Sequence, residues 1–300
     1  MAELSAGTRS GFVALAGRPN VGKSTLVNGM VGHKVAIVSD KPQTTRRAVR
    51  GVATAPEWQL VLVDLPGVQR PRDPLTQRMQ RRVESELAES DAALLVVDGE
   101  QGVGPGDRFL AHLLESAGVP VVVAVNKVDR LNRAETAAVL SAAAAELEIA
   151  DAVFPVPARR GTGVQALAEH LAALVPEGPF LFPPSERTDL PEDVRLAELV
   201  REQVLRRTFQ EVPHAVAVEL EDVERDRPDL VVVRARVLVE TDSQKGILIG
   251  RGGKMIRAIG TAARRELERE LGAQVHLDLR VDVRRRWRAD DALLDRLGIE

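Results

Sequence analysis

Short apolar segments alternate with longer polar and alanine-rich segments through the first half of this 300-residue chain. Almost every residue within each apolar segment is apolar, without the alternation expected of a sheet that has one face in solvent. Continuous runs of this kind are typical of strands buried on both faces of a parallel sheet, with helices between them. We therefore predict an α/β fold with a mostly parallel sheet, whose strands include residues 12–16, 60–63, 92–97, 119–125 and 153–155.

The pattern changes after a proline-rich stretch that contains Pro176, Pro179, Pro183 and Pro184. Neither a helix nor the interior of a sheet tolerates prolines at this density, so the stretch is typical of a linker. The segments beyond it predict a helix, two strands, a helix, a strand and a short closing helix, at residues 193–209, 214–221, 230–240, 253–271, 274–283 and 290–297. We predict a first domain over residues 9–177, a linker over 178–192 and an α+β domain over 193–300.

The composition of the chain excludes several classes of site and protein. The chain has no cysteine, which excludes disulfides, cysteine zinc sites and cysteine nucleophiles. The N-terminal residues lack the basic and then apolar pattern of a secretory signal, and no apolar run has the length of a membrane span. We therefore expect a cytoplasmic protein without a transmembrane segment.

Charge is distributed unevenly although the net charge is only −3. Residues 245–288 carry twelve basic and five acidic side chains, whereas the preceding residues 177–244 are acidic. A compact basic segment of this kind fits a phosphate backbone, and an exposed basic helix face is the alternative explanation. Tyrosine is absent and aromatic residues make up 3% of the chain, so we do not expect bases to stack on aromatic side chains.

A phosphate-binding pattern follows the first apolar run. Residues 17–24 match Gx₄GK[ST], and residues 25–30 continue as a helix-compatible segment, which is the context that the pattern requires. Its glycines let backbone N–H groups surround phosphate oxygens at a helix N-terminus, its lysine reaches the β- and γ-phosphates, and its serine ligates Mg²⁺. The predicted nucleotide contacts here are Gly17, Arg18, Pro19, Asn20, Val21, Gly22, Lys23, Ser24 and Thr25.

Two further motifs follow apolar runs, at the strand ends where open α/β sheets bind ligands. Asp64 and Gly67 belong to a DxxG sequence, whose carboxylate holds Mg²⁺ through water and whose glycine N–H faces the γ-phosphate. Asn126, Lys127 and Asp129 follow the run at 119–125. A carboxylate accepts hydrogen bonds from N1–H and the 2-amino group of guanine, and adenine has neither donor, so Asp129 is expected to select guanine.

A threonine pair lies between the phosphate-binding pattern and Asp64, in the polar stretch at residues 42–46. A hydroxyl from such a loop can complete the Mg²⁺ shell only while the γ-phosphate is present, which makes the loop a switch. Thr45 is favoured for this role, and Thr44 stays open as the alternative. The predicted catalytic residues are then Lys23, Thr45, Asp64 and Gly67, and the predicted Mg²⁺ ligands are Ser24, Thr45 and Asp64.

A glycine-rich loop opens the basic segment of the second domain. Residues 250–253 contain three glycines and precede a predicted helix with Ile256, Ile259 and Ala263 at core spacing. A Gly-x-x-Gly turn lets the backbone of single-stranded RNA come close while basic neighbours meet its phosphates, and a turn that merely starts a helix is the alternative. The predicted RNA contacts are Lys245, Gly250, Arg251, Gly252, Gly253, Lys254 and Arg257.

These motifs together resemble those of a known family. The strings PNVGKST, PQTTR, DLPG and NKVD are similar to the motifs of the Era family of bacterial GTPases, and residues 244–254 resemble the signature of a type 2 KH domain. The fifth motif of such GTPases is usually an Ile-Ser-Ala string that caps the guanine. The matching residues here are Val156, Pro157 and Ala158, so the hydroxyl is absent and a backbone role remains for Pro157 and Ala158.

The resemblance implies an activity and partners. It implies a P-loop GTPase that hydrolyses GTP to GDP and phosphate with Mg²⁺, and that acts in 16S rRNA processing and 30S ribosomal subunit assembly. It further implies that the KH domain binds the 3′ end region of 16S rRNA, and that the protein associates peripherally with the inner face of the cell membrane. Two alternatives are an RNA-binding KH protein with a structural nucleotide domain, and a GTPase of another assembly step.

One departure from other GTPases concerns the residue after the DxxG motif. Ras-like enzymes have a glutamine there that orients the attacking water, and this chain has Val68, which cannot hydrogen-bond a water molecule. We therefore expect slow intrinsic hydrolysis. Some relatives of the family use K⁺ held by a phosphate-loop asparagine, and Asn20 matches that position.

Overall fold

The computed structural model describes residues 7–67, 73–148, 150–158, 161–227 and 229–299. Contacts between Cα atoms divide these residues into two compact units. The first contains residues 7–36, 45–67 and 79–189, and the second contains residues 37–44, 73–78 and 190–299. The chain therefore passes from the second unit to the first between Thr44 and Thr45.

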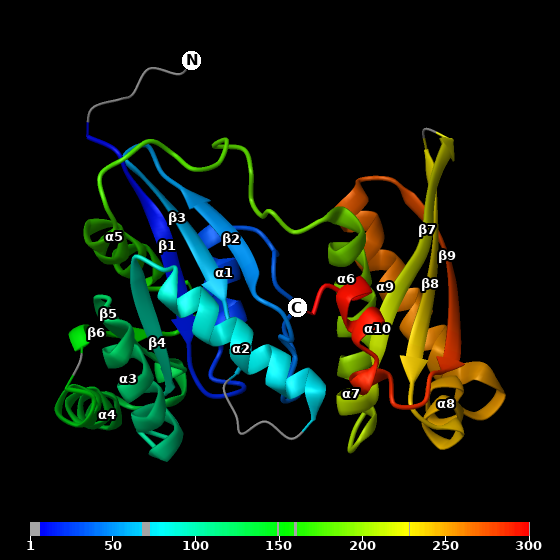
Figure 1. The fold of residues 1–300 in the computed structure, drawn as a ribbon, viewed down its shortest axis with the longest axis horizontal. Coiled ribbons are helices and arrows are strands. Elements are labelled where there is room, and N and C mark those ends of the chain that lie inside the picture. Colours follow the sequence, from blue (N-terminus) through cyan, green and yellow to red (C-terminus); the bar gives the residue numbers. More distant parts are fainter. Residues whose placement is uncertain (1–6, 68–72, 149, 159–160, 228, 300) are drawn as a thin grey trace. The chain divides into compact units, whose positions relative to one another are not determined.

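The first unit is built on a six-stranded sheet with the strand order β2-β3-β1-β4-β5-β6 (Figure 1). All neighbouring strands are parallel except β2, which is antiparallel to β3. This confirms the predicted α/β class and the mostly parallel sheet. The strands are β1 (Arg9–Ala16), β2 (Val49–Thr54), β3 (Trp58–Asp64), β4 (Ala92–Asp98), β5 (Val121–Asn126) and β6 (Ala150–Val156).

Helices cover both faces of this sheet, which explains why its strands are apolar throughout. Helices α1 (Lys23–Val31) and α5 (Val164–Leu174) pack on one face, where Leu26, Leu62 and Leu167 are fully buried. The opposite face is covered by α2 (Pro74–Ala88), α3 (Pro105–Ala117) and α4 (Arg133–Glu146), through a second cluster that includes Leu95 and Leu114. A short 3₁₀ helix, η1 (Val128–Arg130), follows β5.

The proline-rich stretch is hydrogen-bonded to the first unit over much of its length. The buried side chain of Gln59 accepts hydrogen bonds from the amides of Leu181 and Phe182 and donates to the carbonyl of Phe182. Further along, the hydroxyl of Thr188 donates to the carbonyl of Arg50 at 2.6 Å. The stretch therefore runs as an ordered strap, and the change of unit comes one residue after Thr188, between residues 189 and 190.

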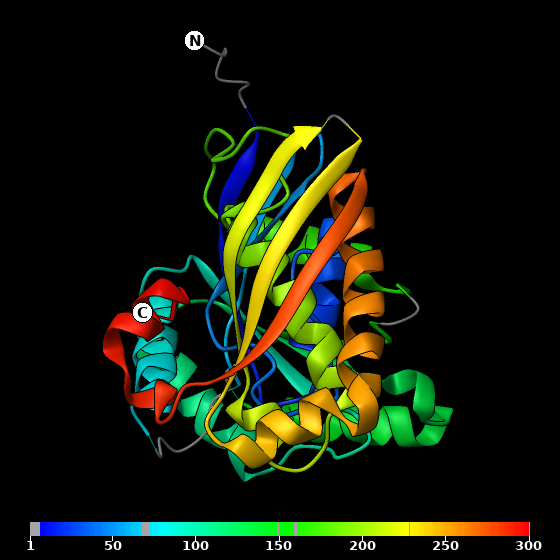
Figure 2. The ribbon, with the colours of Figure 1, turned by 90° about the vertical axis from the view of Figure 1, so that its right-hand side faces the viewer.

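The second unit is a three-stranded sheet with helices on one face, as Figure 2 shows for α6 and α9. Strands β7 and β8 are antiparallel, whereas β8 and β9 are parallel. The elements are α6 (Glu192–Arg207), α7 (Val212–Ala215), β7 (Ala217–Arg227), β8 (Leu230–Val239), α8 (Asp242–Ile249), η2 (Arg251–Gly253), α9 (Lys254–Leu271), β9 (Gln274–Val283), η3 (Trp287–Ala289) and α10 (Asp291–Arg296).

The two faces of this smaller sheet differ in chemistry. Val231, Val233 and Val237 of β8 alternate into the core that the sheet forms with α6 and α9. Arg234 and Arg236 stand at the alternate positions and form ion pairs with carboxylates of β7, such as Arg234 with Asp222 at 2.8 Å. The cations of the outer face are therefore neutralised across the strands.

Helix α6 also holds the segment 37–44, which belongs to the same unit. The buried carboxylate of Glu202 accepts a hydrogen bond from the amide of Val38 at 3.0 Å, and Arg201 donates to the carbonyl of Thr44. Both α6 side chains are almost fully buried. The last residue before Thr45 is thus fixed by the second unit.

Three sequence predictions about elements were wrong. Strand β2 was not predicted. It lies at the edge of the sheet and contains Arg50, Gly51 and Thr54, so it does not form a continuous apolar run. The segment before the glycine loop is the helix α8 and not a turn, and it is capped by the side chain of Thr241. Strand β7 begins at Ala217 and continues to Arg227, whereas residues 214–221 were predicted, so His214 lies in α7.

Candidate functional site

The loop between β1 and α1 approaches other backbone so closely that its glycines are required. A Cβ atom on Gly17 would lie 2.6 Å from the carbonyl oxygen of Val96, and one on Gly22 would lie 2.1 Å from Nδ2 of Asn126. Gly22 also has a φ of 105°, which favours glycine. The loop is therefore pressed against the ends of β4 and β5, where α1 begins.

Lys23 is buried at the foot of this loop with 6% of its surface exposed. Its ammonium donates to the carbonyls of Gly17 at 3.0 Å and Arg18 at 3.2 Å. Burial lowers the pKa of Lys23 to about 8, and the negative charge of Asp64 only partly offsets this effect. An anion beside Lys23 would relieve the cost of burying its charge.

Two hydroxyl groups meet one carboxylate next to Lys23. Ser24 Oγ donates to Asp64 Oδ2 at 2.6 Å, Thr45 Oγ1 donates to the same oxygen at 3.3 Å, and the two hydroxyl oxygens are 3.2 Å apart. Asp64 is fully buried, and burial raises its pKa despite Lys23 and the two hydroxyls. Its other oxygen, Oδ1, has no hydrogen-bond partner within the described ranges. Three oxygen-bearing side chains from separate segments thus converge on one point.

The two threonines of the switch loop behave differently. Thr44 Oγ1 donates to the carbonyl of Lys41 at 2.6 Å and lies 2.8 Å from Oγ of Ser39, so its hydroxyl is used within its own loop. Thr45 is the threonine that reaches Asp64. This geometry supports Thr45 over Thr44 as the residue that acts beside Asp64.

Asn126 joins three of the predicted motifs. Its side-chain amide donates to the carbonyl of Val21 at 2.7 Å, and its Oδ1 accepts from the amides of Lys127 at 2.7 Å and Ala158 at 3.0 Å. The backbone role expected for Ala158 therefore begins with its amide, which ties the loop after β6 to the end of β5. Asn126 acts by holding these loops together.

The remaining predicted nucleotide contacts lie around this centre. Lys127 has a φ of 63° and its ammonium bonds Asp98 at 2.5 Å, and Asp129 follows in η1, half-buried. Asn20 is exposed and has a φ of 64°. Gly67 lies against Pro19, since a Cβ on Gly67 would be 3.0 Å from three atoms of that proline. Pro157 is half-buried beside Ala158, Thr25 lies in α1, and Val68 lies outside the described residues.

The glycine loop of the second unit joins α8 to α9, and its three glycines have positive φ. The φ values are 69° at Gly250, 60° at Gly252 and 74° at Gly253. A Cβ on Gly250 would lie 2.8 Å from Cβ of Met255, whereas one on Gly252 would have no atom of the described chain within 4 Å. Gly250 is therefore needed for packing, and Gly252 leaves an open approach to the backbone.

Basic side chains surround this open approach. Arg251, Lys254 and Arg257 are exposed, and Arg257 donates to the carbonyls of Gly252 and Gly253. Within the described part of the chain, Lys245, Arg251 and Lys254 form no ion pair. By contrast, five other cations between residues 245 and 288 are paired with carboxylates: Arg264 with Glu268, Arg269 with Glu266, Arg280 with Asp278, Arg284 with Asp290 and Arg288 with Glu240. Arg265, Arg285 and Arg286 are exposed.

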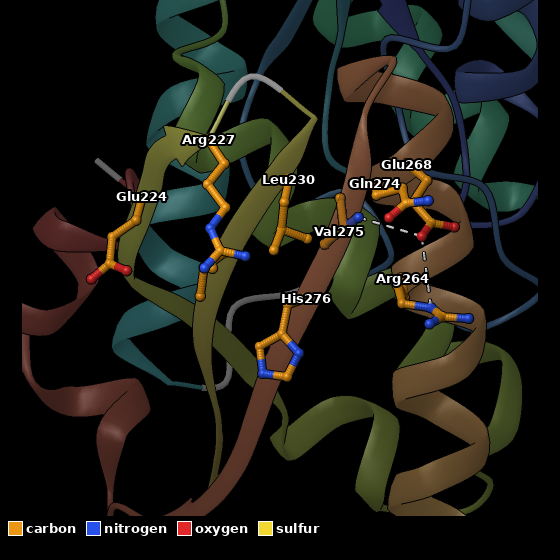
Figure 3. A pocket seen from close by; sticks show the side chains of 9 residues that line it. Glu224, Arg227, Leu230, Arg264, Glu268, Gln274, Val275 and His276 are labelled. Carbon is orange, nitrogen blue, oxygen red and sulfur yellow. Dashed lines mark hydrogen bonds and ion pairs between the residues drawn. The ribbon is translucent and has the colours of Figure 1, made fainter.

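A groove continues from the glycine loop between α9 and β9. A cavity of about 390 Å³ is lined by Ile256, Arg257, Gly260, Thr261 and Arg264 of α9 and by Val275, His276, Leu277 and Leu279 of β9. An adjoining cavity of about 810 Å³ shares Arg264, Val275 and His276, and Figure 3 shows Arg264 beside Glu268 on α9 with His276 on β9. The sequence analysis missed this groove, although the apolar alternation of Leu277 and Leu279 beside a basic helix was a usable signal.

The described residues lack two features that would suggest other functions, a cluster of metal ligands and a membrane-spanning helix. They contain no group of three or more histidine, cysteine, aspartate or glutamate side chains that could hold a metal ion. None of their helices combines the length and apolar character of a membrane span. A metal beside Asp64 would therefore depend on hydroxyl groups and on a ligand for its remaining bonds.

Comparisons with known proteins agree with this geometry. Residues 12–127 match the family model of the 50S ribosome-binding GTPase, and residues 211–288 match that of the KH domain. The chain is 45% identical over 294 residues to GTPase Era of Mycobacterium tuberculosis (strain ATCC 25618 / H37Rv), covering 96% of this chain and 98% of that one. It is 44% identical to GTPase Era of Mycobacterium avium (strain 104), with 97% and 98% coverage.

Solved structures give the same result. The chain superposes with a TM-score of 0.93 and 33% identity on Era in complex with MgGDPNP and nucleotides 1506–1542 of 16S ribosomal RNA, covering 97% of this chain and 99% of the other. A variant of Aquifex aeolicus Era bound to GDP and AlF₄⁻ matches with the same score, identity and coverage.

Proposed function

This chain belongs to the Era family of GTPases, and from that premise we propose that it acts in 16S rRNA processing and 30S ribosomal subunit assembly by binding the 3′ end region of 16S rRNA under the control of GTP. The protein is a GTPase with a KH domain. The observation that carries the proposal is the convergence of Ser24, Thr45 and Asp64 in the first unit, in a chain whose second unit exposes Gly252 among unpaired cations.

Mg²⁺ fits the residues around Asp64. The buried Oδ1 of Asp64 lacks a hydrogen-bond partner among the described residues, and two hydroxyl oxygens lie beside this carboxylate. Oxygen donors of this kind suit Mg²⁺, which retains positions for water and for phosphate oxygens. Ser24 and Thr45 would bind the ion directly and Asp64 through water. When bound, Mg²⁺ neutralises charge on the β- and γ-phosphates.

The chain's own groups supply binding and positioning. Lys23 exchanges the carbonyls of Gly17 and Arg18 for phosphate oxygens, and the amide of Gly67 faces the γ-phosphate. Asp129 reads the guanine edge, and Asn126 holds the base-binding loops against the phosphate loop. Hydrolysis needs little covalent chemistry from the protein, so orientation of these groups contributes most of the rate.

We propose that K⁺ assists hydrolysis at Asn20. The residue is exposed at the mouth of the phosphate loop, where a cation would add positive charge near the β- and γ-phosphates. Turnover should be faster in K⁺ than in Na⁺, and Asn20→Ala should remove the difference. Equal rates of the unsubstituted protein in the two salts would refute this role.

For the second unit we propose that RNA phosphates approach Gly252 while bases enter the groove between α9 and β9. The groove offers Ile256, Leu277 and Leu279 as apolar walls and Arg264 as a cation, which suits unstacked bases of a single strand. Among the described residues that line the groove, His276 carries the one aromatic ring, so hydrogen bonding and apolar contact are expected to replace base stacking on aromatic side chains.

One experiment separates the proposal from its alternatives. GTP turnover is measured with and without a 16S rRNA 3′ end oligonucleotide, beside an oligonucleotide of the same composition in shuffled order. We expect turnover without RNA and selective binding of the native sequence. Absence of turnover would favour a KH protein with a structural nucleotide domain, and equal binding of both oligonucleotides would favour another assembly step.

We further propose a cytoplasmic location, with peripheral association at the inner face of the cell membrane and docking on the 30S subunit.

A further inference from the structure

Arg18, inside the phosphate loop, has all three guanidinium nitrogens bound by one segment of the first unit. Nε donates to Asp107 Oδ1 at 3.0 Å, Nη1 to Gln101 Oε1 at 3.0 Å and Nη2 to the carbonyl of Gly102 at 2.9 Å. These partners lie between the end of β4 and the first turn of α3. The side chain of Arg18 is therefore committed to protein contacts.

The carboxylate of Asp107, which accepts the hydrogen bond from Arg18, is held in place by the start of α3. Asp107 is fully buried, and its Oδ2 also accepts a hydrogen bond from the amide of Gly104 at 2.9 Å, which caps α3. Gly104 and Gly106 leave room for the arginine, since a Cβ on Gly106 would lie 3.0 Å from Cδ of Arg18. Breaking this ion pair is costly, because the carboxylate of Asp107 would be left buried without its partner.

The backbone of Arg18 and its neighbour Pro19 contacts two residues that are proposed to bind the phosphates, Lys23 and Gly67. Its carbonyl accepts a hydrogen bond from Nζ of Lys23 at 3.2 Å. The next residue, Pro19, lies against Gly67, whose amide is assigned to the γ-phosphate. Arg18 thus connects a buried anchor on one side with two groups that meet the nucleotide on the other.

We propose that Arg18 and Asp107 are positioning residues for GTP hydrolysis, which fix the phosphate-loop backbone so that Lys23 and Gly67 reach the γ-phosphate in register. This inference rests on the proposed nucleotide site and adds a specific pair to it. The guanidinium contributes through its planar fork, so a lysine at position 18 cannot replace its three separate bonds. Asp107 contributes its charge, so an asparagine retains the helix cap and loses the anchor.

The test uses Arg18→Lys and Asp107→Asn in the full chain, with Arg108→Ala as the matched control. Arg108 is the neighbour of Asp107 on α3 and forms an exposed ion pair with Glu146, away from the phosphate loop. We expect each of the two variants to lose about 10- to 100-fold in kcat, the size of effect that small misplacements produce. The double variant should lose no more than the worse single variant, because both substitutions break one interaction.

Nucleotide affinity gives a second readout that does not depend on turnover. Binding of a non-hydrolysable GTP analogue should weaken about tenfold more than binding of GDP, because Gly67 faces only the γ-phosphate. Melting temperatures identify any variant that fails to fold. Values of kcat within about twofold of the unsubstituted protein, or equal losses of GDP and analogue affinity, would overturn the proposal. If the unsubstituted protein lacks turnover, the proposed hydrolysis fails, and the affinity ratio still decides the role of the pair.

Discussion

At the scale of single residues, we propose that Asp129 decides which base the protein accepts. Replacing it with Asn exchanges an acceptor for a group that donates and accepts, which suits the 2-oxo group of xanthine better than the 2-amino group of guanine. We expect Asp129→Asn to weaken GTP binding by at least about tenfold and to improve XTP binding. Competition of labelled GTP by ATP, GTP and XTP measures this, and effective competition by ATP in the unsubstituted protein would contradict the assignment.

Lys23 gives the site a pH dependence, since burial lowers its pKa to about 8. Bound phosphates favour the ammonium, so nucleotide binding above pH 8 must take up a proton, and affinity should fall as pH rises from about 7 to 9. The nucleotide-free protein should show the opposite trend. Its unfolded chain holds the proton up to the ordinary pKa of lysine, so this residue makes the fold more stable as pH rises above 8.

Calorimetry in buffers of different ionisation enthalpy measures the proton uptake, and thermal melting of the nucleotide-free protein measures the second trend. Lys23→Arg is the control, because its guanidinium stays charged through this range. Proton uptake that persists in Lys23→Arg would show that another group titrates.

At the scale of elements, the loop between α8 and α9 contains one glycine that packing requires, Gly250, and one that is open to a ligand, Gly252. Gly252 is open, so a side chain there meets only the strain of its φ of 60°, about 1 kcal/mol. Gly252→Asp adds a negative charge where an RNA phosphate is proposed to approach. Gly252→Asn adds the same shape without charge and tolerates left-handed backbone. We expect the Asp variant to lose at least about tenfold more RNA affinity than the Asn variant, with GTP affinity unchanged in both.

Filter binding with a 16S rRNA 3′ end oligonucleotide at fixed salt measures this difference. Equal losses in the two Gly252 variants would mean that bulk, and not charge, is excluded there. RNA affinity unchanged in both would remove the loop from the interface.

The helices and strands also show which parts of the fold can be predicted from the sequence. Continuous apolar runs identified the strands that are buried on both faces, because their environment is uniform along their length. Strand β2 pairs at an edge with one neighbour, and α8 is eight residues long with an interior Gly246, so neither has a distinctive period. The nucleotide-binding motifs could be recognised in the sequence because the chemistry that they serve fixes the spacing of their residues. Arg18 and Asp107 lie 89 residues apart, and nothing local pairs them.

At the scale of the whole molecule, the chain offers a direct covalent route for coupling GTP to RNA. Thr44 and the segment before it are held by Arg201 and Glu202 of α6, while Thr45 bonds Ser24 and Asp64 in the first unit. If Thr45 binds Mg²⁺ only while GTP is bound, as proposed, the position of Thr44 would depend on the nucleotide. Coupling must be reciprocal, so the factor by which GTP changes RNA affinity equals the factor by which RNA changes GTP affinity.

We expect the GTP-analogue and GDP forms to differ in RNA affinity by about 5- to 150-fold, the usual range of coupling between sites. Titrations of the RNA oligonucleotide against both forms measure this, and Glu202→Gln should reduce the ratio without removing GTP binding. Equal RNA affinities of the two forms would refute coupling alone and leave both binding sites in place.

The ion pairs of the KH domain determine how its RNA binding responds to salt. Arg264, Arg280 and Arg284 already have carboxylate partners, so each must give up an ion pair before it can neutralise a phosphate and release the counterions condensed on the RNA. Lys245, Arg251, Lys254 and Arg257 surround the glycine loop, where the strand is proposed to bind. Counterion release from single strands gives a slope of about −0.7 per phosphate in a plot of log affinity against log salt, so four cations predict a slope near −3. A slope much steeper than that would mean that RNA reaches arginines beyond the loop, either the exposed Arg265, Arg285 and Arg286 or those that the free protein keeps in ion pairs.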